Sequence, residues 1–65
     1  MDALYNLRPT TLAAIVADLE YHDEEIEPLT PWAARFKQDC LDVLGQIMGR
    51  SSVDRLIEEA LQTIT

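Results

Sequence analysis

Large apolar residues recur at helical spacing in the first third of the chain. Four of them stand at positions i, i+3, i+4 and i+7, the stripe of an amphipathic helix: Leu12, Ile15, Val16 and Leu19. We expect this helix to cover about residues 11–24. Thr10 and Thr11 follow a proline, and either hydroxyl could cap the free amides of the first turn.

The end of this first helix is left open by two opposing signals. Ile26 continues the heptad line of the helix, which favours a late end. Pro28 takes Glu27 out of the helical region, because its ring clashes with a preceding residue in α conformation. The helix is therefore expected to end between Tyr21 and Ile26.

The second helix has the clearest beginning in the chain. Thr30 can cap the first turn, and Pro31 can occupy the first helical position without losing a hydrogen bond. We expect a helix over residues 31–48, with Gly49 as its C-cap and Gly45 allowing a neighbouring helix to come near. Its apolar face is wider than a single stripe and comprises Trp32, Phe36, Cys40, Leu41, Val43, Leu44, Ile47 and Met48.

A third helix is expected over residues 52–64. Ser51 and Asp54 have the spacing of a capping box at its start. Its inward positions should be Val53, Leu56, Ile57, Ala60, Leu61 and Ile64. The first nine residues contain too little periodicity to choose between a short helical turn and an extended arm.

The pattern predicts an all-α fold. Short connections make consecutive helices adjacent and opposed, so we expect one helical domain over residues 1–65. Its architecture should be a small antiparallel three-helix bundle with a short N-terminal arm or turn. Because the helix at 31–48 has the widest apolar face, it is expected in the middle.

Chain length adds an expectation of self-association. A chain of 65 residues buries only about 60% of the surface that its unfolded form exposes. Its single Cys40 and single His22 provide neither a disulfide nor a common structural zinc site. A homodimer would supply the missing burial. The apolar residues left over for it are Tyr5, Leu41 and Met48.

Charge is concentrated in one stretch. The formal net charge is −7, and six of the 12 acidic residues lie within positions 18–27, with no lysine or arginine between Arg8 and Arg35. A solvated run of charge is the ordinary interpretation. The sharper interpretation is a binding surface, because carboxylates at the end of a helix face the negative end of its dipole and are disfavoured there.

As a binding surface, the stretch would attract a basic partner protein. Carboxylates would guide the approach, and the neighbouring aromatic residues would anchor the complex. The candidate partner-binding residues are Asp18, Glu20, Tyr21, Asp23, Glu24, Glu25, Glu27 and Trp32. An inhibitor, antitoxin or immunity factor that imitates nucleic acid would be one example.

Metal binding and catalysis receive little support. Glu20, His22, Glu24 and Glu25 include plausible metal ligands, but one histidine without a second is a weak signal, and we expect no metal and no cofactor. Cys40 lies on the apolar face of its helix, where a thiol behaves as a small hydrophobic group. The protein is therefore not expected to be an enzyme.

The acidic balance also argues against nucleic acid and membranes as direct partners, since both carry negative charge. The helices at 31–48 and 52–64 could imitate a helix-turn-helix. The second of them contains three acidic residues and Arg55 as its one basic residue, so DNA phosphates would repel it. The sequence contains no signal-peptide pattern or apolar span, which favours the cytoplasm. Two functions remain: a self-associating, non-catalytic protein-interaction module, or an acidic neutraliser of a basic or nucleic-acid-binding protein.

Overall fold

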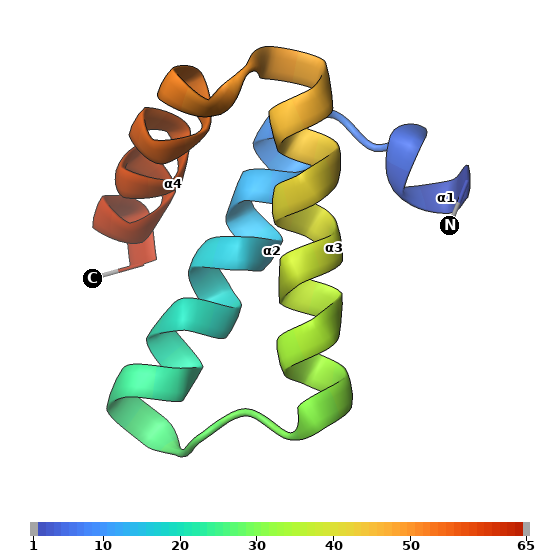
Figure 1. Ribbon diagram of the computed structural model, residues 1–65. Helices are drawn as coiled ribbons and strands as arrows, with labels where there is room; N and C mark the ends of the chain where they lie inside the picture. The colour runs from blue at the N-terminus through green and yellow to red at the C-terminus, as the bar shows by residue number, and fades with distance from the viewer. Residues whose placement is uncertain (1, 65) are drawn as a thin grey trace.

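The computed structural model describes residues 2–64, and all of their regular structure is helical (Figure 1). The elements are α1 (Asp2–Tyr5), α2 (Pro9–Tyr21), the π-helix η1 (His22–Ile26), α3 (Pro31–Met48) and α4 (Arg50–Ile64). The all-α prediction is confirmed, with no strand in this range. Helix α3 has the expected bounds, whereas α2 and α4 each begin two residues earlier than expected. None of the described helices is long and apolar enough to cross a lipid bilayer.

The start of α2 differs from the prediction in its cap. Arg8 is the N-cap residue, with φ −70° and ψ 148°, and no side chain bonds to the first turn. Neither Thr10 nor Thr11 is the cap, because Pro9 already occupies the first helical position, which suits its fixed φ, and holds Arg8 extended. Both threonines are exposed within the first turn.

The two ends of α3 follow the prediction. The Thr30 hydroxyl oxygen accepts a hydrogen bond from the backbone N–H of Ala33 at 3.4 Å, and Pro31 stands at the first helical position. Gly49 ends the helix with φ 84°. This left-handed value is accessible to glycine because it lacks a Cβ.

Helix α4 begins directly after Gly49. Its first residue is Arg50, so Ser51 lies inside the first turn and is not the N-cap that a capping box with Asp54 requires. The backbone N–H of Val53 bonds to the Gly49 carbonyl at 3.3 Å. The α3–α4 connection is thus a single residue, which turns the chain sharply without a loop.

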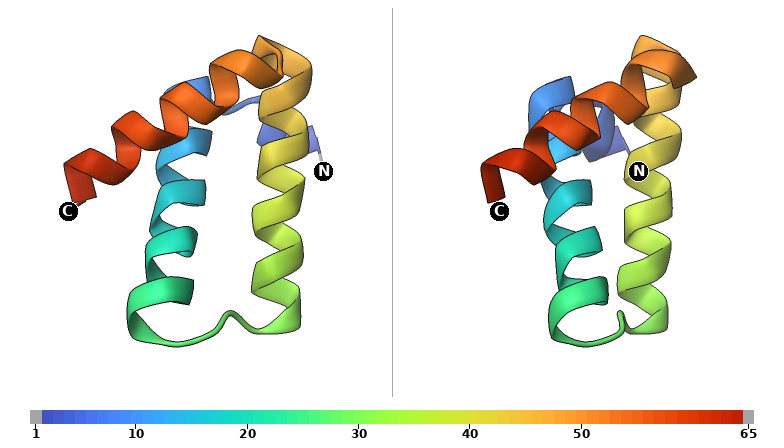
Figure 2. Two further views of the ribbon diagram at one scale, coloured as in Figure 1. Left: turned by 60° about the vertical axis from the view of Figure 1, so that its left-hand side comes forward. Right: turned by 90° about the vertical axis from the view of Figure 1, so that its left-hand side faces the viewer.

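Helix α2, and not α3, is the centre of the packing. It contacts both α3 and α4, while α3 and α4 share a smaller contact with each other. Helices α2 and α3 lie side by side in opposite directions, and α4 crosses α2 obliquely (Figure 2). The expected central place of α3 was wrong because residues 12–17 are all apolar and include alanines at which neighbouring helices can approach closely.

The core joins residues from every α-helix. Its largest fully buried side chains are Leu12, Val16, Cys40 and Leu44. Leu4 of α1 is also buried, and the Tyr5 hydroxyl donates a hydrogen bond to Gln46 Oε1 at 2.6 Å. The N-terminal segment is therefore a helical turn docked on α3. Gly45 does not serve a close approach, since a Cβ added there would have no neighbour within 4 Å.

Candidate functional site

The acidic stretch forms the closed end of the helical hairpin made by α2 and α3. Helix α2 passes without a break into η1, since Tyr21 and His22 both have α-helical dihedral angles. The backbone N–H of Glu27 bonds to the His22 carbonyl, five residues earlier, at 2.9 Å. The α-helix thus ends at Tyr21, and the π-helix continues it to Ile26. These are the two limits between which the helix was expected to end.

Glu27 leaves the helical path as its position before Pro28 predicts. Its dihedral angles are φ −161° and ψ 154°, an extended conformation. Asp23, Glu24 and Glu25 lie in the π-helical turn before it, and this turn contains no lysine or arginine. These carboxylates therefore lie at the negative end of the α2–η1 dipole, where anions are disfavoured.

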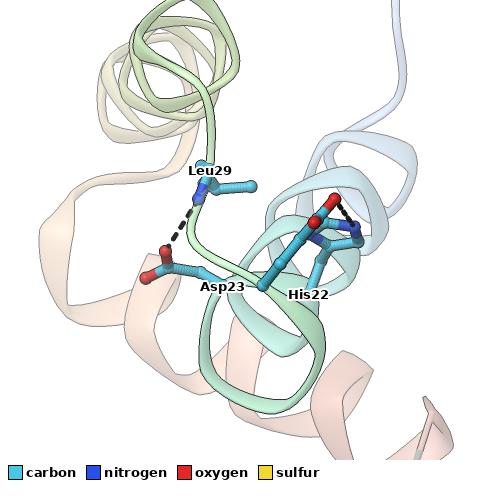
Figure 3. A network of polar contacts seen from close by, with 4 residues as sticks. His22, Asp23 and Leu29 are labelled. Carbon is cyan, nitrogen blue, oxygen red and sulfur yellow. Dashed lines mark hydrogen bonds and ion pairs between the residues drawn. The ribbon is translucent and has the colours of Figure 1, made fainter.

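One of these carboxylates holds the loop that follows. Asp23 Oδ1 accepts a hydrogen bond from the backbone N–H of Leu29 at 3.1 Å, across the turn from His22 (Figure 3). Thr30, the next residue, caps α3. The loop is thus fixed at two consecutive residues. Asp23 therefore has a structural role, whereas the sequence had predicted it as a partner-binding residue.

Two further carboxylates have basic neighbours. Lys37 Nζ lies 3.6 Å from Glu20 Oε1, and both side chains are partly buried between α2 and α3. His22 Nε2 lies 3.9 Å from Glu27 Oε1, which is longer than a hydrogen bond. The Glu20–Lys37 pair links the two helices of the hairpin and leaves Glu20 less available to a partner.

The remaining carboxylates are Asp18, Glu24 and Glu25, all exposed and without a hydrogen bond or ion pair within residues 2–64. They do not form one group. Asp18 lines a groove of about 310 Å³ between α2 and α4, together with Leu56 and Glu59. Glu24 and Glu25 alone project unpaired from the hairpin end.

Two large apolar side chains are exposed at the same end. Trp32, in the first turn of α3, is 74% exposed, and Ile26, the last residue of η1, is 64% exposed. Tyr21 is only partly exposed. We call the group formed by Asp23, Glu24, Glu25, Ile26, Glu27 and Trp32 the hairpin-end surface.

Ile26 was missed as a surface residue because it continues the heptad line of α2. A turn closed by an i→i+5 bond contains more residues than an α-helical turn, so each residue advances by a smaller angle. The side chain of Ile26 is therefore rotated about the helix axis from the direction that a regular α-helix would give it. Pro28, which prevents further α-helix, was the signal that this line ends.

The residues expected to mediate self-association are only partly available. Tyr5 and Met48 are 49% and 37% exposed, and Ile47, which was not predicted to mediate self-association, is also exposed. Leu41 differs, because it packs against the core. It lines a groove of about 540 Å³ between α3 and α4 that also includes Gly45.

Two groups considered for other chemistry are the Cys40 thiol and the possible metal ligands around His22. Cys40 is fully buried, burial raises the pKa of its thiol above the ordinary value, and the charge of Asp39 raises it further. Such a thiol is a poor nucleophile near neutral pH. In the described part of the chain, no three His, Cys, Asp or Glu side chains gather to hold a metal ion, so the candidate ligands around His22 are not brought together.

Comparisons with protein-family models, with curated proteins and with solved structures found no match for this chain.

Proposed function

We propose that this chain is a small, non-catalytic protein-interaction module built on an antiparallel three-helix bundle. The observation that carries the proposal is the exposure of Trp32, 74% of whose surface is open to solvent. Tryptophan is enriched, with tyrosine and arginine, among the residues that contribute most to the binding energy of protein interfaces. With Ile26 exposed at the same hairpin end, it supplies apolar contact area outside the core.

The way in which Trp32 is held supports this role. Its helix turn is capped by Thr30, and the preceding loop is fixed by Asp23 through the Leu29 amide. A side chain on an ordered backbone loses less conformational freedom on binding than one on a mobile loop. The hairpin-end surface is thus suited to bind a partner without rearrangement of its backbone.

Affinity capture from lysate of the source organism tests the proposal. Immobilised wild-type chain should retain at least one partner protein that Trp32→Ala fails to retain. Ile64→Ala is the matched control, because Ile64 is another exposed large apolar residue, near the end of α4. Equal retention of every bound protein by wild type and Trp32→Ala would contradict the proposed role of the hairpin end.

Self-association is a second candidate, favoured by the contact between α1 and the end of α3. The Tyr5–Gln46 hydrogen bond holds Tyr5 against α3 close to Ile47 and Met48, which are also exposed. Light scattering should give the mass of a dimer at high micromolar concentration, and Met48→Glu should give the mass of one chain. A single-chain mass for the wild type would exclude the homodimer.

A further inference from the structure

We propose that the hairpin-end surface binds a basic, amphipathic segment of a partner protein, with the cations of that segment against Glu24 and Glu25 and its apolar side chains against Trp32 and Ile26. This inference rests on the proposed function and adds the chemical class of the partner. It draws on three separate observations: unpaired charge, exposed apolar area and an ordered backbone.

The first observation is the sign of the unpaired charge. Glu24 and Glu25 form no ion pair within residues 2–64, while Lys37 of α3 is engaged with Glu20. Arg35 is the only other lysine or arginine between Arg8 and Arg50. The negative end of the α2–η1 dipole lies at the same place, so a cation gains from both the carboxylates and the helix end.

The second observation is the apolar area beside this charge. Ile26 and Trp32 are the two most exposed large apolar residues of the described chain. A free metal ion or a wholly polar cation would leave their surface in water, whereas an amphipathic segment would bury it. The face of an indole ring also attracts the guanidinium group of arginine.

The same charge argues against a second copy of this chain at the hairpin end. A two-fold interface places the same patch of each subunit opposite the other. Glu24 and Glu25 would then meet like charges from the other copy, which costs affinity. Anionic lipid surfaces and nucleic-acid backbones are disfavoured for the same reason.

The third observation is that the backbone is already ordered. The Glu27 N–H bonds to the His22 carbonyl at 2.9 Å, and the Leu29 N–H bonds to Asp23 at 3.1 Å. The backbone that carries the charged residues, Ile26 and the start of α3 is thus fixed before a partner arrives. Such preorganisation lowers the entropy lost on binding.

A peptide titration tests the class of partner directly. Trp32 is the only tryptophan in the sequence, so its fluorescence reports on this surface alone. The probes are a synthetic helical peptide with leucine on one face and lysine and arginine on the other, and a second peptide with glutamine in place of every basic residue. We expect the basic peptide to shift Trp32 emission to shorter wavelength at low salt and the glutamine peptide to bind about tenfold more weakly or worse.

Two double variants separate local charge from net charge. Glu24→Gln with Glu25→Gln should weaken binding of the basic peptide by about tenfold. Asp54→Asn with Glu58→Gln removes the same charge from exposed positions of α4 and should change the affinity by less than about twofold. Circular dichroism verifies that both variants keep their helices.

Three results would overturn the inference. Equal weakening by the two double variants would show that only net charge matters. Equal binding of the glutamine peptide would leave the hairpin end as an interaction surface but not one for a basic partner. Absence of any Trp32 response to the basic peptide would also reject the partner class, while the proposed function itself falls only if Trp32→Ala retains every partner in the capture experiment.

Discussion

Asp23 and Leu29 are joined across the hairpin loop by a hydrogen bond of 3.1 Å from the Leu29 amide to Asp23 Oδ1. This contact explains why a carboxylate is present at the disfavoured end of a helix. Asp23 organises the loop locally, while its neighbours Glu24 and Glu25 do not. One acidic stretch therefore contains both a structural residue and residues available for binding.

Asp23→Ala should lower the free energy of unfolding by about 0.5–1 kcal/mol, because one solvent-exposed hydrogen bond to the loop is lost. The matched change is Glu24→Ala, which removes an unpaired carboxylate from the same turn and should leave stability unchanged or slightly higher. Urea denaturation of both variants measures the difference. If both changes have the same effect, Asp23 does not hold the loop.

Ala17→Leu should destabilise the fold by about 1–3 kcal/mol, because Ala17 is fully buried in the central helix and added carbon atoms would overpack it. Ala14→Leu adds the same atoms to an exposed position that lines the groove between α2 and α4 and should change stability little. Thermal unfolding followed by circular dichroism compares the two. Similar midpoints would mean that α2 is not the packing centre.

Gly45 within α3 and Gly49 directly after it should respond in opposite directions to alanine. Gly49→Ala should destabilise by about 1–3 kcal/mol, since φ 84° is strained for a residue with a Cβ. Gly45→Ala should stabilise by up to about 1 kcal/mol, because alanine has the higher helix propensity and its Cβ meets no atom within 4 Å. Chemical denaturation decides both signs, and a loss of stability in Gly45→Ala would reveal a packing role for this position.

Cys40 should make stability depend on pH in the alkaline range. Burial, with Asp39 adding to it, raises the pKa of the thiol in the folded chain, so the folded state holds this proton more tightly than the unfolded state. The resulting stabilisation is complete below the unfolded thiol pKa of about 8.5 and is lost as the pH rises further.

The test of this pH dependence is the difference in unfolding free energy between wild type and Cys40→Ala, measured from about pH 7 to pH 10. The constant part of the difference is the lost packing, and the part that shrinks with rising pH belongs to the thiol. A difference that stays constant over this range would contradict the assignment.

Helix existence was predictable from the sequence because large apolar residues mark one face of each long helix. The order of packing was not. Ala13 and Ala17 carry little weight in a count of large apolar residues, yet both are buried in α2, the helix that has neighbours on two sides. The N-cap at Arg8 was also missed. Thr10 and Thr11 are common capping residues and were predicted as caps, but Pro9 before them is already the first residue of the helix.

The sequence predicted where in the fold the candidate surface lies, but not which residues form it. The acidic stretch and Trp32 indicated the hairpin end. Sequence alone could not show that Glu20 would face Lys37, that Asp23 would bond to the loop, or that Asp18 would line a different groove, because each depends on which helix lies opposite. Ile26 was not predicted to be exposed, because it continues the heptad pattern of α2. The π-helical turn changes its direction from the one that a regular α-helix would give.

The central place of α2 also has a consequence for how the protein is made. Its two neighbours follow it in the chain, and the more distant, α4, extends to Ile64. During synthesis, α2 leaves the ribosome before α3 and α4, and one of its faces stays uncovered until α4 has emerged. A nascent chain stalled after Met48 would expose this face, so we expect the packing around α2 to be complete only when α4 has emerged.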